Sequence, residues 1–112
     1  MNAAQVELLI PNIRLPASAS EVWYWENNYM DAAQLIRFDA PLSDARAFAK
    51  ALLHHDIRPD TRPDLPKRDM PWWRDDFPPG AEGTDEMIGG RFIKIMILPI
   101  GDKQARVWLS LS

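Results

Sequence analysis

Proline is concentrated in one part of this chain, and this concentration constrains the fold more than any other feature. Six of the ten prolines lie between Pro59 and Pro79. Because proline fixes φ and lacks an amide hydrogen, neither a helix nor a central strand can run through such a stretch. We therefore expect a long Pro/Gly-rich loop over residues 56–90. The chain has 112 residues, which predicts a single domain spanning 1–112 that contains this loop.

Two stretches before the loop have the composition of β-strands. Residues 21–29 (EVWYWENNY) are rich in aromatics, and residues 32–40 (AAQLIRFDA) alternate, with Leu35 and Arg37 on the face opposite Ile36. Asn and Asp residues between the two stretches favour a turn. This pattern predicts an antiparallel hairpin.

A helix is predicted over residues 41–55 (PLSDARAFAKALLHH). Apolar residues recur in it at helical spacing and form one stripe, made of Ala45, Phe48, Ala49, Leu52 and Leu53. We expect Ser43 to be the N-cap, with Asp44 in the first turn, where the helix dipole favours a negative charge. The stripe indicates that this helix packs against one face of a sheet.

Two further strands are expected after the loop, at residues 91–101 and 105–112, joined by a short polar turn. Residues 6–10 (VELLI) are a candidate for an additional short edge strand. The fold class is therefore α+β, with a small antiparallel sheet of four or five strands and one helix packed on one face, in the order β-β-α-loop-β-β.

Composition makes several classes of function unfavourable. The net charge is −3 and the sequence has no block of Lys or Arg, so we expect no nucleic-acid partner. Cysteine is absent, so the chain has neither disulfides nor thiolate ligands. No apolar stretch is long enough to cross a bilayer, so we expect no membrane span.

The first residues do not have the pattern of a secretory signal peptide. A basic start is missing, and Glu7 and Pro11 interrupt the short apolar run. By default the chain as given is expected to be cytoplasmic, and an envelope or periplasmic location applies if a signal has been removed.

Several segments together resemble a group of known proteins. The order LPASASEVWYW, LIRFDAPLSDARAFAKALL, a Trp-Trp loop and a closing ARVWLSL is similar to small uncharacterised bacterial proteins, some of which are envelope lipoproteins. The lipid-bearing cysteine of such lipoproteins is absent from this chain. The resemblance implies no known activity and no functional residues.

Motifs for catalysis or metal binding are weak. His54 and His55 are the only histidines, and adjacent helical residues point about 100° apart, so they do not converge on a zinc ion. We therefore expect no metal and no cofactor. The serines lack a G-x-S-x-G context, and Gly89-Gly90 precedes a strand rather than a helix.

An acidic stretch is the one candidate for hydrolytic chemistry. It comprises Asp75, Asp76, Asp85 and Glu86. Two carboxylates can serve as acid and base when their surroundings separate their pKa values. Neighbouring carboxylates in a Pro/Gly loop are more often solvated surface groups.

The tryptophans are the most informative side chains. Trp23 and Trp25 share one face of their strand, and Trp108 lies opposite Val107. The Pro-rich loop is expected to fold across Trp108, with one tryptophan of the Trp72-Trp73 pair buried. The other, expected to be Trp73, stays exposed for a partner. The candidate binding residues are Trp72, Trp73, Trp23, Trp25, Tyr29 and Asp75.

Two hypotheses about function remain. The first is a small non-enzymatic interaction domain, such as an inhibitor, an immunity-type factor or an accessory protein, which binds another protein or a second copy of itself. The second is a small carbohydrate-binding module or hydrolase that uses the Trp72–Asp76 loop. A pocket in which Asp75, Asp85 and histidine converge would favour the second, and a flat aromatic patch or a symmetric dimer would favour the first.

Overall fold

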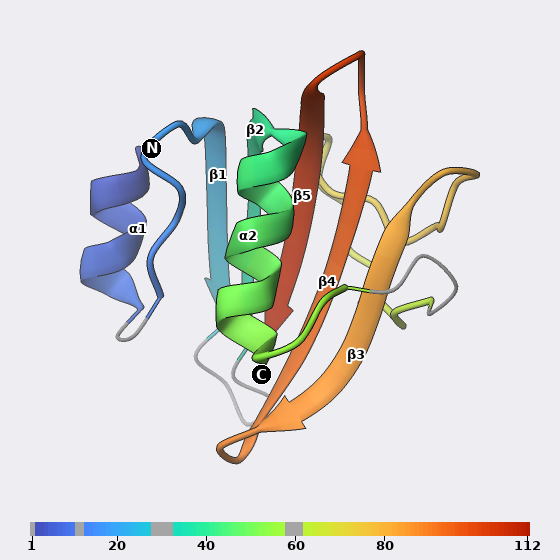
Figure 1. Cartoon of the computed structure of the whole chain (residues 1–112). Coiled ribbons are helices and arrows are strands. Elements are labelled where there is room, and N and C mark those ends of the chain that lie inside the picture. The colour runs from blue at the N-terminus through green and yellow to red at the C-terminus, as the bar shows by residue number, and fades with distance from the viewer. Residues whose placement is uncertain (1, 11–12, 28–32, 58–61) are drawn as a thin grey trace.

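The computed structural model describes residues 2–10, 13–27, 33–57 and 62–112 (Figure 1). These residues form an α+β fold with one five-stranded antiparallel sheet and two helices. In chain order the elements are α1 (Ala3–Leu9), β1 (Ser20–Asn27), β2 (Ala33–Pro41), α2 (Leu42–Leu53), β3 (Glu82–Ile88), β4 (Arg91–Pro99) and β5 (Gln104–Leu111). The α+β class and the antiparallel sheet are thus as expected, but a second helix is present.

The sheet has the strand order β1-β2-β5-β4-β3. The last strand of the chain, β5, therefore lies at the centre and joins the β1–β2 hairpin to the β3–β4 hairpin. Its side chains are buried on both faces, since Val107 and Trp108 belong to two different core clusters. The expected pairing of residues 21–29 with 32–40 is confirmed over the described part of both strands.

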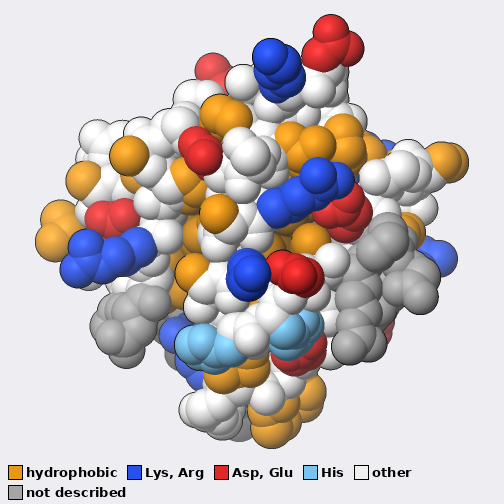
Figure 2. Space-filling model, in the orientation of Figure 1, with side chains coloured by type: hydrophobic (Ala, Val, Ile, Leu, Met, Phe, Trp, Pro, Cys, Tyr) orange, Lys and Arg blue, Asp and Glu red, His pale blue; other side chains and the backbone are white. Residues whose placement is uncertain are grey.

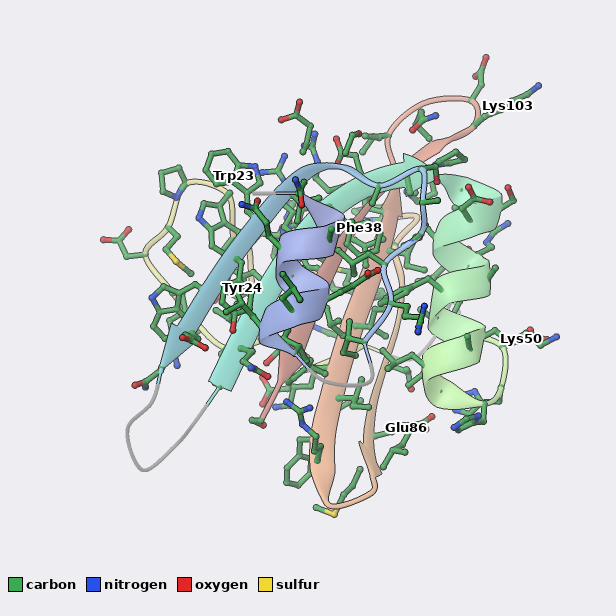
Figure 3. All side chains as sticks on the ribbon, turned by 90° about the vertical axis from the view of Figure 1, so that its left-hand side faces the viewer. Trp23, Tyr24, Phe38, Lys50, Glu86 and Lys103 are labelled. Carbon is green, nitrogen blue, oxygen red and sulfur yellow. The ribbon has the colours of Figure 1, made fainter. Side chains whose placement is uncertain are left out.

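The two faces of the sheet are covered by different kinds of structure (Figures 1 and 3). On one face α1, residues 13–19 and α2 enclose the main core, where Phe48 of α2 meets Phe38 of β2 edge to face at 5.3 Å. On the other face, residues 62–81 cross the sheet without forming a helix or strand. Both faces are buried, and this is why β4 and β5 are apolar on both sides.

The expectation of an edge strand at residues 6–10 is wrong, because most of this segment belongs to α1. Asn2 and Gln5 form a reciprocal capping box, in which each side chain accepts a hydrogen bond from the other residue's backbone amide. Val6 and Ile10 lie four residues apart and are both fully buried. The apolar run therefore has helical rather than alternating periodicity.

The start of α2 also differs from expectation, since Ser43 is not its N-cap. Pro41 occupies the cap position and offers no side-chain hydrogen bond. Instead the amide of Leu42 donates to the carbonyl of Lys103, in the β4–β5 loop, at 2.7 Å. A tertiary contact thus satisfies one of the backbone amides in the first turn that have no partner within the helix.

The boundaries of the expected loop are wrong at its C-terminal end, because residues 82–88 form β3. Ile88 pairs with Arg91, so Gly89 and Gly90 make a two-residue hairpin turn, and both have positive φ. Two positive φ values in succession are typical of a type I′ turn, which glycine adopts without strain. The polar sequence of β3 is held in the sheet by this turn and by its apolar partner β4.

Candidate functional site

All five tryptophans lie on the face of the sheet that residues 62–81 cover, and we call this surface the tryptophan face. It comprises Trp23, Trp25, Trp72, Trp73 and Trp108. The strand alternation expected for β1 is confirmed: Trp25 joins this side, whereas Val22 and Tyr24 pack with the helices. Figure 3 shows Trp23 on the same side of β1 as the loop.

Arg37 lies between two tryptophans in one row across the sheet. It is paired with Trp23 of β1 on one side and with Trp108 of β5 on the other. Burial lowers the pKa of the Arg37 guanidinium and nearby Arg106 lowers it further, while Asp39 acts in the opposite direction. Its Nε is buried and has no hydrogen-bond partner among the described residues. The row therefore contains a cation in a largely apolar setting.

The backbone of Trp72 fixes the covering loop to this row. Its carbonyl oxygen accepts two hydrogen bonds, one from Nη1 of Arg37 and one from Nε1 of Trp108, each at 3.3 Å. The Trp72 ring then stacks on Trp23, with centroids 6.2 Å apart and planes 16° apart. One residue of the loop thus contacts three strands.

Trp73 is the buried member of the pair, so the expectation that it would be the exposed one is wrong. It is 7% exposed and packs with the cluster around Trp108. Its Nε1–H donates to the carbonyl of Pro66 at 2.8 Å, and its ring meets Trp72 edge to face at 5.9 Å. Trp72 is half-buried and packs in the same cluster, so the two rings share one environment and neither of them is exposed as expected.

Trp23 is the tryptophan most open to solvent. It lies on the edge strand β1 and is 46% exposed, whereas Trp25 and Trp72 are half-buried. Tyr29, also expected at this surface, lies outside the described residues. The exposed aromatic area therefore centres on Trp23, with the half-buried Trp72 stacked against it.

Two arginines cover the rings on the loop side. The guanidinium of Arg68 lies 5.2 Å from the Trp25 ring centroid, and that of Arg74 lies 5.7 Å from the Trp108 ring centroid. Arg74 also makes a bidentate ion pair with Asp76, both contacts being 2.6 Å. That ion pair lowers the pKa of the Asp76 carboxyl below its ordinary value. The expected binding residue Asp75 lies half-buried next to this pair.

The carboxylates of the proposed hydrolytic site do not gather in one place. Asp85 lies 3.9 Å from Lys94, whereas the next residue of β3, Glu86, pairs with His55 on the helix side of the sheet. His54 is exposed at the left-handed C-cap of α2, with φ of 64°. No group of three or more His, Asp or Glu side chains in the described ranges is arranged to hold a metal ion.

Sequence reasoning missed the arginines of the tryptophan face. One signal was present, because alternation in β2 places Arg37 beside Leu35 on the face away from α2. Large apolar residues on the second face of a strand, next to an arginine, indicate that another segment of the chain packs on that face. Arg68 and Arg74 have no such signal, since their positions depend on the path of an irregular loop.

Comparison with protein-family models, with curated proteins and with solved structures found no match to this chain. The described helices include none that is long and apolar enough to cross a membrane.

Proposed function

We propose that this chain is a small protein-binding domain and that its binding surface is centred on Trp23 and Trp72. The observation that supports this most is the exposure of Trp23, an indole held in a fixed stack at the edge of the sheet. Tryptophan is enriched among the residues that dominate protein–protein binding energy. A monomer gains little from leaving such a ring in water.

The surface is held in place before any partner arrives. Trp72 is tied by its carbonyl to Arg37 and Trp108, and Trp73 anchors the same loop below the surface. A preorganised loop loses little conformational entropy on binding, which improves affinity. Arg68 next to Trp25 adds a cation at the border of the aromatic area. A partner with an apolar side chain flanked by a carboxylate fits this arrangement.

The arrangement of carboxylates gives little support to the hydrolase alternative. Asp76 is committed to Arg74, and Asp85 and His55 lie on opposite sides of the sheet. Three cavities of the described residues lie along α2, and none is lined by residues of the Trp72–Asp76 loop. A carbohydrate-binding module remains the second candidate, because the exposed ring of Trp23 beside Trp72 is also suited to stacking on a sugar.

Trp23→Ala is the variant that tests the proposal, and Phe92→Ala is its matched control. Phe92 is also 46% exposed, but it lies on β4. Wild type and both variants are used to capture proteins under crosslinking, and each captured protein is then purified and titrated by calorimetry. We expect Trp23→Ala to lower the affinity for a specific partner by about 30-fold or more, which corresponds to roughly 2 kcal/mol of binding free energy. Phe92→Ala should bind like wild type.

Two outcomes would contradict the proposal. One is that every specific partner binds Trp23→Ala as tightly as wild type. The other is that the wild type binds glycans on an array, that Trp23→Ala does not bind them, and that no protein partner depends on Trp23. The second outcome would favour the carbohydrate-binding alternative.

A further inference from the structure

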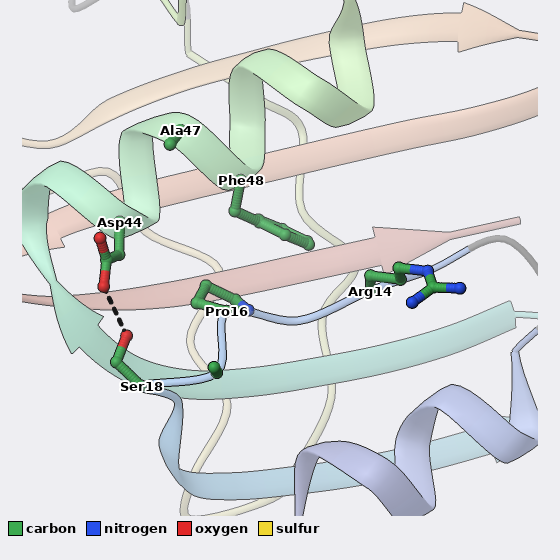
Figure 4. A pocket seen from close by; sticks show the side chains of 7 residues that line it. Arg14, Pro16, Ser18, Asp44, Ala47 and Phe48 are labelled. Atoms are coloured by element: carbon green, nitrogen blue, oxygen red, sulfur yellow. Dashed lines mark hydrogen bonds between the residues drawn. The ribbon is translucent and has the colours of Figure 1, made fainter.

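A groove runs along the exposed flank of α2 (Figure 4). Two adjoining cavities of about 470 and 380 Å³ share Arg14 and Phe48, and together they form one depression between residues 13–18 and α2. We call it the α2 groove. Its apolar lining includes Ile13, Pro16, Ala47, Phe48, Ala51 and Leu52.

Only two charged side chains line the α2 groove, and they differ in their partners. Asp44 accepts a hydrogen bond from the hydroxyl of Ser18 at 2.7 Å, at one end of the groove. Arg14 is exposed and makes no hydrogen bond or ion pair with the described residues. The groove therefore offers an apolar lining and one uncompensated positive charge.

The neighbouring helix α1 has the complementary features. Leu8 is 87% exposed and Leu9 is 44% exposed, while Val6 and Ile10 anchor the other side of the helix in the core. Glu7, next to Leu8, makes no ion pair within the described part of the chain. α1 thus presents two leucines and a carboxylate that its own molecule does not use.

We propose that two copies of this chain associate through these surfaces, with α1 of each copy lying in the α2 groove of the other. Leu8 and Leu9 would bury against the groove, and Glu7 would pair with Arg14 of the second copy. The lengths match: α1 has seven residues and spans about 10 Å, and the groove follows α2 from Asp44 to Leu52, about 12 Å. Packing an apolar helix face into a groove is a recurrent mode of recognition.

The positions of the two surfaces suit a two-fold symmetric dimer. α1 and α2 lie on the same face of the sheet, with residues 13–19 between them (Figures 1 and 4). A two-fold axis close to residues 13–18 places each α1 over the other copy's groove, and a two-fold interface must be self-complementary in this way. Around these features, acidic and basic side chains are interspersed on this side of the molecule, with hydrophobic side chains between them (Figure 2). A surface of mixed charge repels a second copy less than a surface with charges of only one sign.

This inference goes beyond the proposed function and does not depend on it. The α2 groove is on the helix side of the sheet, and the tryptophan face is on the loop side. A dimer formed through α1 therefore leaves both copies of Trp23 accessible.

The test uses sedimentation equilibrium of the full chain over a concentration series. We expect a reversible monomer–dimer equilibrium that Leu8→Asp abolishes and that Trp23→Ala leaves unchanged. Glu7→Arg alone and Arg14→Glu alone should each weaken the dimer by about tenfold or more, because each places like charges opposite one another twice in the homodimer. All these side chains are at least partly exposed, so circular dichroism should show that the variants remain folded.

Mixing the two charge variants gives the sharpest result. In the mixed dimer the cation introduced by Glu7→Arg in one copy faces the carboxylate introduced by Arg14→Glu in the other, and the second contact is the native pair. We therefore expect the mixture to dimerise about as strongly as wild type, which a contact within one molecule cannot produce. A wild type that stays monomeric at every concentration, a dimer that tolerates Leu8→Asp, or a mixture that stays as weak as its components would each overturn the proposal.

Discussion

Trp73 is the largest buried side chain of residues 62–81, which cover the sheet, so Trp73→Ala tests directly whether this loop is anchored. The change removes an indole that is 7% exposed, its edge-to-face contact with Trp72 and its hydrogen bond to Pro66. Replacing a buried tryptophan by alanine costs about 3–5 kcal/mol through lost burial and the cavity that remains. Domains of this size have a total stability of about 5–15 kcal/mol, so the loss should be large.

Urea unfolding followed by far-ultraviolet circular dichroism measures this loss without relying on tryptophan fluorescence. With an m-value of about 1.5 kcal/mol/M, a cost of about 4 kcal/mol lowers the midpoint by roughly 2–3 M. Trp23→Ala is the control, since about half of that side chain is already in water. We expect its cost to be about 1–2 kcal/mol, from partial burial and the stack on Trp72.

The comparison of these two variants decides whether the loop is anchored as described. A cost below about 1 kcal/mol for Trp73→Ala, or equal costs for the two variants, would refute the reasoning, because a buried anchor and an exposed ring cannot contribute alike. Hydrogen exchange of the indole N–H groups is an independent measurement of which rings are buried. Nε1–H of Trp73 and Trp108 should exchange slowly, because both donate to carbonyls, and that of Trp23 should exchange quickly.

Two further predictions concern a glycine and a tyrosine. Gly83→Ala should destabilise the fold by about 1–3 kcal/mol in urea unfolding, because the added Cβ would lie 2.5 Å from Cδ of Pro63, whereas Gly101→Ala has nothing within 4 Å and should be close to neutral. Burial, with help from Glu26, raises the pKa of Tyr24 from 10.0 to about 12. The folded state therefore holds this proton more tightly than the unfolded state, so its contribution to stability is complete below pH 10 and is lost as the pH rises to about 12. Urea midpoints across that window should fall less for Tyr24→Phe than for wild type, and equal falls would contradict the raised pKa.

The sequence predicts well those parts of the fold in which the periodicity of apolar residues alone determines which side chains are buried. Alternation in β1 predicts Trp23 and Trp25 on one face, and the structure agrees. Helical spacing in α2 identified the stripe that contains Phe48, which is buried. When one face of a helix or strand is buried, apolar residues recur at a fixed spacing in the sequence. This spacing can be recognised without knowing the rest of the fold.

The errors occur where a local preference competes with a contact made elsewhere. Residues 82–88 are poor in strand-forming side chains and form β3 because a Gly-Gly turn pairs them with an apolar strand. The first amide of α2 donates to the carbonyl of Lys103, far away in sequence, and the cap residue Pro41 makes no side-chain hydrogen bond. For α1 a local signal did exist in the Asn2–Gln5 capping box, and it outweighs the strand composition of residues 6–10.

The burial of Trp73 could not be predicted from the residues next to it. Arg74 and Asp75 follow Trp73 and suggest solvent, but Arg74 lies over the Trp108 ring and pairs with Asp76. The charged neighbours are thus part of the cover rather than a sign of exposure. The loop is also held at the Trp72 carbonyl, which accepts hydrogen bonds from side chains on β2 and β5, far away in sequence. That information is non-local, so no window of sequence around residues 71–80 contains it.

The two proposals together assign different tasks to the two faces of one sheet. The helix side would join two copies through α1 and the α2 groove, and the loop side would carry one tryptophan face per copy. Because a two-fold axis on the helix side points both tryptophan faces outward, the dimer would be a bivalent binder. Bivalence converts a second binding event into an intramolecular one and raises the apparent affinity for a partner that is itself dimeric or repeated. Leu8→Asp should therefore lower the apparent affinity for an immobilised, densely presented partner while leaving the affinity for a single soluble partner unchanged, whereas Trp23→Ala should lower both.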